Sequence, residues 1–515
     1  MTPHLLAQTE PLETPNIEWS LLWPLVILSL GAILLITITS VVPKLRGNGF
    51  AAAFTAAVAI AAGWSLWFVN RELDGRRVLA VAGAISVDDF TMFITAIICI
   101  ALVLVALTLD DYLRREGLDG PEWYVLLLIS AVGAVLLASA EDLIVAFLGL
   151  EVMSIAVYVL ASMHMRRTTS QEAGFKYFIL GALASSLFLY GIAMVYGATG
   201  TTSLTGISEA YFAEGIAGRP ADASSLILVG LALMIAGFAF KVSAAPFHFW
   251  TPDVYHGAPT PIVGFMASVV KAGAFAGMLR LLIIGFAPMR DDWQIPIAAL
   301  AIFTILIGAI LAVVQTDVKR MLAYSSISHA GFILIGVYAA GSSDASESLT
   351  GSTSVLFYLL AYAVVAAGTF AAVTAVSGVG DDHTSLDNFN GLVKRTPLLA
   401  GLFAILLFAQ AGVPFTSGFL AKMRVIGAAA DTGAYALAGS AMLASAIGAY
   451  LYLRIVVSMF MQGDDDEADN SALSVPPALM FAIAIAVVVT ITLGVAPDLI
   501  KDPLSDAAAM VASGS

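Results

Sequence analysis

The chain has 515 residues, of which 60% are hydrophobic and 12% are charged, and its mean hydropathy is +0.93. A soluble protein of this length could not bury so much apolar surface, and runs of about 20 apolar residues, the length that crosses a hydrocarbon core of about 30 Å, recur along the chain. These values identify a membrane protein. The net charge of −14 comes largely from acidic segments such as 464–469, which are typical of solvated loops and do not indicate a nucleic-acid partner.

The small number of cysteines restricts the cofactor chemistry of the chain. Cys99 is the only one and lies in an apolar run, so iron–sulfur ligation, zinc ribbons and disulfide scaffolds are excluded. We therefore expect no redox centre, metal or other cofactor in this chain. The first twenty residues contain no Lys or Arg, so the first apolar span is expected to be retained rather than cleaved as a signal peptide.

Hydropathy predicts about fourteen transmembrane helices, and hence an all-α polytopic membrane protein. In chain order the predicted spans are 21–42, 50–69, 87–109, 121–139, 142–162, 172–199, 224–257, 260–286, 294–314, 318–340, 353–377, 397–429, 434–461 and 475–497.

The charges of the loops predict how these helices are oriented. Loops after odd-numbered spans carry five basic pairs, whereas the opposite side has few Lys or Arg residues apart from the cluster 71–77. By the positive-inside rule the basic loops face the cytoplasm, so both termini are predicted to lie outside. The five pairs are Lys44 and Arg46, Arg114 and Arg115, Arg166 and Arg167, Lys319 and Arg320, and Lys394 and Arg395.

Two predicted spans are longer than thirty residues and contain proline among polar residues. The seventh includes SAAPFHFWTPD, and the twelfth includes AQAGVPFTSGF. Proline removes a backbone donor and clashes with the preceding turn, so each helix is expected to split into two halves. Because the breaks lie five spans apart, an odd number, we predict two inverted five-helix repeats with functional groups near the midplane.

This pattern divides the chain into four predicted domains. Three N-terminal spans occupy 1–120, the first repeat 121–290 and the second repeat 291–462, and an acidic loop with a C-terminal span follows over 463–515.

Four ionisable residues fall deep inside predicted spans, where a charge costs several kcal/mol unless it is paired or hydrated. Glu151 lies near the middle of the fifth span and Lys271 near the middle of the eighth. Lys241 precedes the break in the seventh span, and Lys422 follows the break in the twelfth. Each could form a static ion pair that locks helix packing, but their distribution over both repeats and beside both breaks favours a proton relay.

The energies involved also suit a relay. Burial weakens the hold of an amine on its proton, and a nearby carboxylate strengthens it. At an assumed separation of about 10 Å and an effective dielectric constant of about 15, Glu151 and Lys241 would interact by about 2 kcal/mol. Moving one charge through about 100 mV costs about 2.3 kcal/mol. Opening or closing one ion pair could therefore bias a proton against a membrane potential.

Two histidines and two outlying cations are further candidates. His329 lies in the tenth span within the hydroxyl-rich stretch 325–329, which could order water, although a structural role explains this histidine almost as well. His248 falls at the break of the seventh span, where it could line a mouth or gate. Lys176 lies near the cytoplasmic end of the sixth span, where protons would be taken up. Arg280 lies near a span end and is expected to extend its side chain to water.

Several blocks of the sequence agree, in order, with one protein family. The blocks are FKYFILGALASSLFLYGIAMVYGATGT, FKVSAAPFHFWTPDVYHGAPTP, KRMLAYSSISHAGF and GVPFTSGFLAKMRV. Together they resemble the subunit N family of bacterial NADH-quinone oxidoreductase (respiratory complex I), within the wider antiporter-like family, from about residue 85 to 460. Lys422 stands where subunit M carries a glutamate, and the final fifty residues hold one predicted helix rather than the long lateral helix of subunit L.

The resemblance implies that Glu151 and Lys241 form an interacting pair, that Lys271 is the central relay group and that Lys422 is the exit-side proton carrier. It implies a proton-translocating membrane-arm subunit of NADH:quinone oxidoreductase in the bacterial cytoplasmic (inner) membrane. NAD, flavin, iron–sulfur clusters and quinone would then be bound by partner subunits. The expected partners are the antiporter-like subunit M, the small membrane subunits and the lipid bilayer.

On this interpretation a proton is taken up from the cytoplasm near the seventh and eighth spans. Separation of Glu151 from Lys241 lowers the proton affinity of the inner lysines, and the proton passes Lys271 and water near His329 to Lys422, from which it leaves outward. Two other interpretations remain open. One is a subunit of a multisubunit sodium/proton antiporter, although no further intramembrane carboxylate cluster is present for sodium. The other is a structural membrane scaffold whose charges form inert ion pairs.

Overall fold

The computed structural model describes residues 17–212, 221–461 and 474–512, and nearly all of these residues are helical. Eleven helical segments within this part of the chain are long and apolar enough to cross a membrane, and three shorter apolar helices accompany them. The long segments are η1–α1 (Trp19–Val41), α2 (Asn48–Leu73), α3 (Asp89–Glu116), α5 (Leu143–Ser162), α6 (Thr168–Thr199), α10–η4 (Thr260–Gly285), η5–α12 (Ala287–Val313), α13 (Val318–Ala340), α14 (Ala345–Val376), α18 (Tyr435–Phe460) and α19 (Pro477–Val495).

The remaining elements are shorter. The short apolar helices are α4 (Glu122–Ala138), α8 (Ala221–Lys241) and α16 (Pro397–Ala411). The other α-helices are α7 (Leu204–Phe212), α9 (Trp250–Gly257), α15 (Leu392–Arg395), α17 (Ser417–Asp431) and α20 (Lys501–Ala512). Segment α10–η4 consists of α10 (Thr260–Phe265), the π-helical turn η3 (Met266–Val270), α11 (Lys271–Arg280) and the π-helical turn η4 (Leu281–Gly285). The 3₁₀ turns are η1 (Trp19–Leu22), η2 (Pro43–Leu45), η5 (Ala287–Met289), η6 (Val379–Asp381), η7 (Leu386–Phe389) and η8 (Pro497–Ile500), and the two strands are β1 (Val78–Ala80) and β2 (Ile85–Val87).

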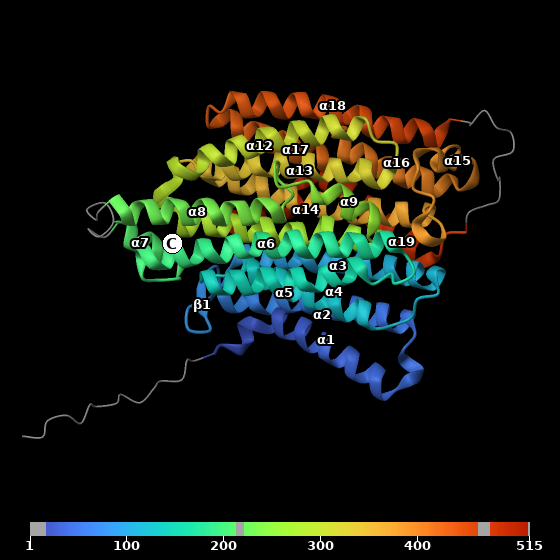
Figure 1. Ribbon diagram of the computed structural model, residues 1–515, viewed down its shortest axis with the longest axis horizontal. Helices are drawn as coiled ribbons and strands as arrows, with labels where there is room; N and C mark the ends of the chain where they lie inside the picture. Colours follow the sequence, from blue (N-terminus) through green and yellow to red (C-terminus); the bar gives the residue numbers. More distant parts are fainter. Residues whose placement is uncertain (1–16, 213–220, 462–473, 513–515) are drawn as a thin grey trace, which may run out of the picture.

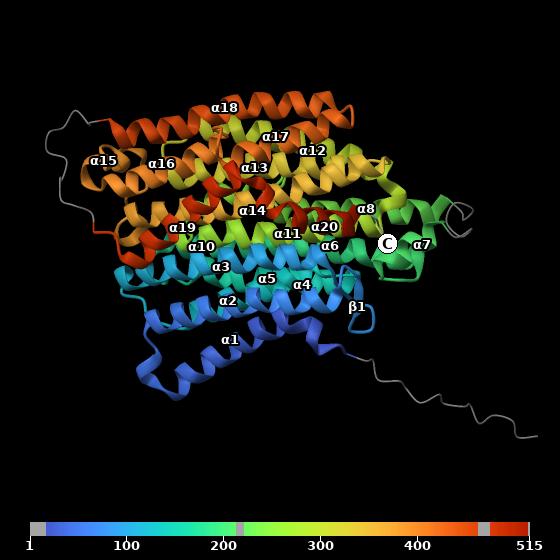
Figure 2. The same cartoon turned by 180° about the vertical axis from the view of Figure 1, so that it is seen from behind.

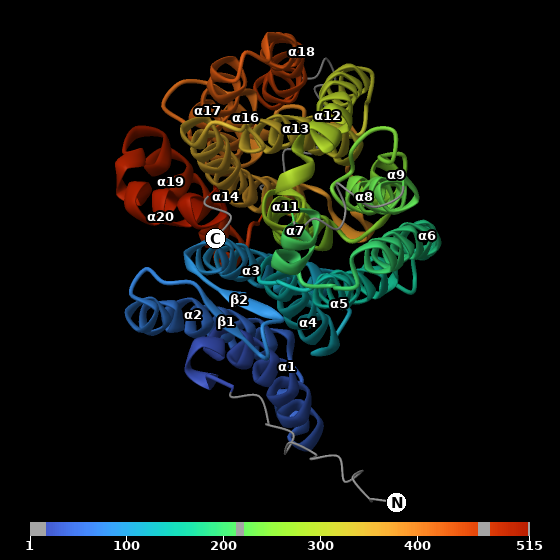
Figure 3. The same ribbon diagram turned by 90° about the vertical axis from the view of Figure 1, so that its left-hand side faces the viewer.

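The helices lie side by side as one bundle (Figure 1), with α1 and α2 at one edge and α18 at the other. An end-on view (Figure 3) places α11 and α14 near the centre. In agreement with this, the apolar parts of α14 and of the segment from Thr260 to Gly285 are wholly buried. From behind (Figure 2), α19 and the short C-terminal α20 lie across α14 and α3.

The predicted breaks in the two long spans are both confirmed. Helix α8 ends at Lys241 and α9 begins at Trp250, so the segment around Pro246 separates two halves. Helix α16 ends at Ala411 and α17 begins at Ser417, on either side of Pro414. A proline that removes one backbone donor and clashes with the preceding turn accounts for both interruptions.

The same turn occurs at the start of two helices. Asp142 caps α5 and accepts a hydrogen bond from the hydroxyl of Thr202, while the amide of Leu143 donates to the Thr202 carbonyl over 2.8 Å. Asp317 caps α13 and accepts from the hydroxyl of Thr384, and the amide of Val318 donates to the Thr384 carbonyl, also over 2.8 Å. An Asp at the cap satisfies helix amides that would otherwise have no partner.

Close helix packing accompanies each turn, because glycines let two backbones approach. A Cβ added at Gly149 of α5 would lie 2.6 Å from the Leu137 amide nitrogen of α4, and one added at Gly331 of α13 would lie 2.6 Å from the Ile305 amide nitrogen of α12. Neither distance leaves room for a methyl group.

A Gly149→Ala substitution is therefore expected to push α4 away from α5 and to destabilise the protein by about 1–3 kcal/mol, the usual cost of overpacking. Thermal denaturation of the detergent-solubilised protein measures the effect. Gly401→Ala is the matched control, since a Cβ there meets no atom within 4 Å. Equal stability of the two variants would contradict the expectation.

The two ends of the bundle differ in character. A short antiparallel hairpin, β1–β2, lies at one end, which we call the hairpin end, and it is the exception to the predicted all-α fold. Arg115, Arg167 and Lys319, which contact Thr374 or Asp381, lie at the other end together with Arg395 of α15 (Figure 1), and we call this the basic end. At the hairpin end, Arg77 forms an ion pair with Glu141 over 2.5 Å. Arg77 belongs to the basic cluster 71–77, the exception to the predicted distribution of basic loops.

The prediction that Arg280 extends to water is wrong. Its side chain is 1% exposed and forms an ion pair with Asp88 over 2.8 Å, with Thr91 and the Ala138 carbonyl as further acceptors. A position near a span end is equally compatible with snorkelling and with an internal carboxylate partner, and here the partner lies in a loop that is distant in sequence.

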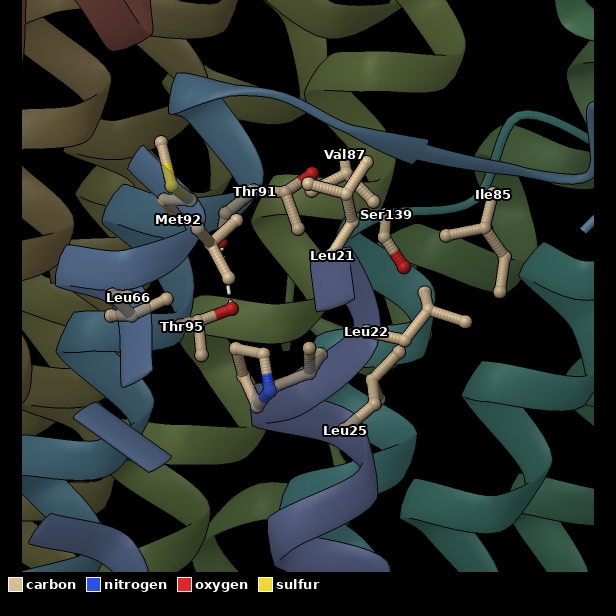
Figure 4. A pocket seen from close by; sticks show the side chains of 13 residues that line it. Leu21, Leu22, Leu25, Leu66, Ile85, Val87, Thr91, Met92, Thr95 and Ser139 are labelled. Atoms are coloured by element: carbon tan, nitrogen blue, oxygen red, sulfur yellow. Dashed lines mark hydrogen bonds between the residues drawn. The ribbon is translucent and has the colours of Figure 1, made fainter. Parts of the chain in front are cut away.

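An apolar pocket of about 20 Å³ lies at the hairpin end. Figure 4 shows Leu22 and Leu25 on one side of it and Thr91, Thr95 and Ser139 on the other. None of the described residues that line it is ionisable, so it is not part of the site described next.

Candidate functional site

Helices on successive layers of the bundle carry the predicted site residues. Glu151 lies on α5, Lys241 at the end of α8, Lys271 at the start of α11, His329 on α13 and Lys422 on α17. In Figure 1, α5, α8, α13 and α17 are met in this order across the bundle, and Figure 2 places α11 between α3 and α13. The residues therefore lie on a row of helices that crosses the bundle from α5 towards α18.

Glu151 begins the row at the face formed by α5 and α6. It is partly exposed, and its carboxylate accepts a short hydrogen bond from the hydroxyl of Ser185 on α6. Within the part of the chain that the structure describes, no ion pair joins Glu151 to Lys241. The predicted pair is therefore not in direct contact in this structure.

Lys241 is surrounded by aromatic side chains. It is 4% exposed, and its Nζ lies 5.2 Å from the ring centroids of both Tyr158 and Tyr177. The same Nζ donates a hydrogen bond to the Tyr177 hydroxyl over 3.3 Å. Trp250, the first residue of α9, stacks on Tyr177 with 4.3 Å between ring centroids. Aromatic faces attract a cation without carrying a charge themselves.

Lys271 lies at the centre of the bundle, directly after the π-helical turn η3. It is 2% exposed, and its Nζ donates to the carbonyl of Ser326 over 2.7 Å and to the hydroxyl of Ser326 over 2.6 Å. The Tyr362 hydroxyl donates to the Ser326 hydroxyl oxygen as well, over 2.8 Å. π-Helical turns occur frequently at functional sites, and here one precedes the central amine.

His329 and Lys422 share the far end of the row. The imidazole nitrogens of His329 lie 2.7 Å from the Tyr358 hydroxyl and 3.1 Å from the Tyr452 hydroxyl. Lys422 is 6% exposed and donates to the carbonyl of Ala411, the last residue of α16, over 3.0 Å.

A small cavity joins this histidine and lysine. About 10 Å³ of space is open to water there, close to the minimum that holds a single molecule. Its polar lining consists of Ser325, Ser328, His329, Lys422 and Tyr452.

Two other buried cations are neutralised by carboxylates. Arg280 pairs with Asp88 over 2.8 Å, and Lys319 pairs with Asp381 over 3.2 Å. Burial disfavours the charged form of Asp381, but Lys319 and Arg167 offset this effect and hold the pKa of that carboxyl below its usual value. Among the described residues, by contrast, no carboxylate oxygen lies within 4.0 Å of the Nζ of Lys241, Lys271 or Lys422.

The two secondary candidates lie outside this row. Lys176 lines a polar pocket of about 190 Å³ at the basic end and forms ion pairs with Glu172 over 2.7 Å and with Asp253 over 2.9 Å. His248 lies in the break between α8 and α9, partly exposed, with a buried Nδ1 that has no hydrogen-bond partner among the described residues. Among those residues, no group of three or more His, Cys, Asp or Glu side chains is arranged to hold a metal.

The structure thus brings His329 and Lys422 together around one cavity and keeps Glu151, Lys241 and Lys271 apart. Sequence reasoning missed the tyrosines that lie beside the relay residues, above all Tyr177, Tyr362 and Tyr452. Their signal in the sequence is a phenol within an apolar span, because a buried hydroxyl requires a hydrogen-bond partner.

Comparison with known proteins gives consistent results. The profile of the family described as NADH:quinone oxidoreductase/Mrp antiporter, TM, matches residues 140–464. NADH-quinone oxidoreductase subunit N 3 of Streptomyces griseus is 39% identical, over 96% of this chain and 95% of that protein. A chain of respiratory complex I from Thermus thermophilus matches with a TM-score of 0.76 and 32% identity, over 94% of this chain and 99% of that chain. A chain of the Mrp complex from Dietzia shares the fold, with a TM-score of 0.81 and 22% identity over 96% of this chain and 98% of that chain.

Proposed function

The chain belongs to the NADH:quinone oxidoreductase/Mrp antiporter family, in its subunit N branch, and from this membership we propose a route by which it moves protons. It is a multi-pass, proton-translocating membrane-arm subunit of NADH:quinone oxidoreductase, and other antiporter-like membrane subunits are its partners. On this proposal NAD, flavin, iron–sulfur clusters and quinone are bound by other subunits of the complex.

We infer that the chain crosses the membrane fourteen times. The eleven long segments and three short apolar helices supply these crossings. The turn made by Asp142 and Thr202 lies at the hairpin end, beside Glu141, whereas the equivalent turn of Asp317 and Thr384 lies at the basic end. The same turn at opposite ends supports two inverted five-helix repeats, and we retain domain boundaries near residues 120, 290 and 462.

The basic end faces the cytoplasm on this proposal, and the protein lies in the bacterial inner membrane with both termini outside. The gathering of basic loops at one end supports this orientation. Arg77, which argued against it in the sequence, is neutralised by Glu141 and contributes little net charge to its own side.

The proposed relay follows the row of buried residues. A proton is taken up at the basic end, and a change in the distance between Glu151 and Lys241 alters how strongly Lys241 holds it. The proton then passes Lys271 and the surroundings of His329 to Lys422, and it leaves outward. Quinone reduction in other subunits drives the cycle.

One contrast supports this function over an inert scaffold. Arg280 and Lys319 have carboxylate partners and are fixed cations, whereas the hydrogen bonds of the three relay lysines, within the described parts of the chain, go to neutral groups. A buried cation without a counter-ion is costly, so such a lysine can exchange between charged and neutral forms. A static scaffold would need paired lysines throughout.

Glu151→Gln tests the proposal in the assembled complex. The amide keeps the size of the side chain and can still accept from Ser185, but it removes the charge that acts on Lys241. We expect proton transport to fall at least about tenfold, a modest value for the loss of one proton-controlling group. The measurement is proton uptake into proteoliposomes during NADH oxidation.

Glu209→Gln is the matched control, since Glu209 is an exposed carboxylate on α7 that lies outside the row. Normal pumping by Glu151→Gln in a normally assembled complex would contradict the relay. Loss of assembly without loss of chemistry would instead favour a scaffold. A requirement for sodium in place of protons would favour the antiporter interpretation.

A further inference from the structure

Tyr452 is a buried tyrosine on α18, a helix at the edge of the bundle that exposes much of its surface. Its neighbours on α18, Tyr450 and Leu453, are 57% and 48% exposed, whereas Tyr452 is 3% exposed. Its hydroxyl lies 2.5 Å from the Ser325 hydroxyl and 3.1 Å from Nε2 of His329. Both partners belong to α13, so this side chain of α18 forms a buried polar contact between the two helices.

The hydrogen-bond directions around Tyr452 follow from Gln410. Its amide nitrogen donates to the Thr369 hydroxyl over 2.7 Å, so its amide oxygen faces Ser325, which donates to it over 3.2 Å. A hydroxyl has one proton to donate. Ser325 donates its one proton to Gln410, so its oxygen must accept the hydrogen bond from Tyr452.

Counting donors and acceptors in the same way gives the directions of the His329–Tyr452 and Tyr358–His329 hydrogen bonds. Since Tyr452 donates to Ser325, its oxygen accepts from His329, which must carry its proton on Nε2. In a neutral imidazole the other nitrogen is an acceptor, so Nδ1 of His329 accepts from the Tyr358 hydroxyl over 2.7 Å. Every donor in this chain points the same way, from Tyr358 towards Gln410.

Tyr452 also forms part of the wall of the water-sized cavity that Lys422 lines. Lys271, in contrast, binds Ser326 rather than Ser325. Successive residues on a helix point about 100° apart, so the two serines serve different polar groups. Among the described residues, no hydrogen bond joins the group around Lys271 to the group around Lys422. On the Lys422 side, the cavity and its polar walls are the groups through which a proton can approach the amine.

We propose that Tyr452 is a proton-relaying residue that passes protons from His329 to the cavity beside Lys422, with Gln410 setting the direction in which its hydroxyl donates. This inference rests on the proposed function and adds one residue to its route. In the transfer, the Nε2–H bond of a protonated His329 breaks and a bond forms to the Tyr452 oxygen. The original Tyr452 proton passes to Ser325, whose own proton turns from Gln410 into the cavity and is released to water there, and that water gives a proton to neutral Lys422. Tyrosine is neutral before and after, and one positive charge moves from imidazole to amine.

Tyr452→Phe removes the hydroxyl and keeps the ring. In the assembled complex reconstituted into proteoliposomes, we expect proton transport per electron to fall about as far as in Lys271→Met, with normal assembly. Tyr450→Phe, two residues away and exposed, is the control and should pump normally.

Two more substitutions separate relay from positioning. Gln can donate and accept hydrogen bonds, but on different atoms, so Tyr452→Gln should be as defective as Tyr452→Phe. Histidine can take up a proton on one atom and release one from another, so Tyr452→His should recover part of the pumping. Wild-type pumping by Tyr452→Gln would overturn the relay role.

The outcomes also separate this inference from the function on which it rests. If Lys271→Met fails to pump while Tyr452→Phe pumps normally, the tyrosine relay is wrong and the proposed function stands. If both variants pump normally, the proposed function itself is wrong.

Discussion

Replacing Lys271 by methionine is expected to abolish proton translocation through this subunit. Methionine fills a similar volume but cannot hold a proton, and the buried Nζ that donates to Ser326 is lost. A positioned proton-transfer group contributes about 10²–10⁴-fold to a proton-transfer rate, so a residual rate below about 1% is expected. The measurement is the number of protons taken up per electron by the reconstituted complex during NADH oxidation.

Lys271→Arg separates charge from proton transfer. Arginine keeps the positive charge and stays protonated in proteins, so it should also fail to pump. Lys394→Met at the basic end is a suitable control, because it removes a lysine outside the row. Normal pumping by Lys271→Arg would show that the position needs a fixed charge and would contradict a relay through this residue.

Replacing Asp88 by asparagine is expected to destabilise the protein by about 3–5 kcal/mol, because it leaves Arg280 as an unpaired buried cation. Asparagine keeps the shape of Asp88 and can still cap α3 through the Thr91 amide, so the change isolates the charge. The thermal unfolding midpoint and the amount of assembled complex both report the loss.

Asp344→Asn is the matched control. Asp344 also caps a helix, α14, but it is exposed and has no buried cation to neutralise, so little change is expected. The double variant Asp88→Asn with Arg280→Met should recover most of the lost stability, since no charge is then left unpaired. A double variant as unstable as Asp88→Asn would contradict the ion-pair explanation.

The pH dependence of this pair has a defined sign. Burial opposes ionisation of Asp88, but Arg280 and the Thr91 amide outweigh it, so the pKa of Asp88 in the folded protein lies below its ordinary value of 3.8. A depressed pKa stabilises the fold above the unfolded value, and this stabilisation is lost as pH falls through the folded value. Between pH 5 and 8 the contribution of Asp88 is therefore constant.

The breaks in the two long helices could be predicted because their cause is local. Pro246 and Pro414 act on the turn that contains them, wherever the helix lies in the bundle. The depth of Glu151 and Lys271 in their spans follows equally from counting residues along a helix.

What each buried group contacts could not be predicted in the same way. Whether Tyr452 faces lipid or His329 depends on how α18 is rotated about its axis, which packing against other helices decides. The partner of Arg280 is a loop residue, Asp88, that hydropathy does not connect to it. The separation of Glu151 from Lys241 likewise depends on the tyrosines between α5 and α8, and the family pattern implied only that the pair interacts.

The interrupted helices also explain how unpaired lysines can be accommodated. Lys241 lies in the last turn of α8, and Lys422 donates to the final residue of α16, so each lysine is associated with the carboxyl end of a half-helix. The carboxyl end of a helix carries a partial negative charge equivalent to about half an electron. Unlike an aspartate, a carbonyl never binds a proton at physiological pH. Each lysine therefore has a permanent, moderate electrostatic anchor that neither competes for its proton nor becomes an isolated full charge once that proton has gone.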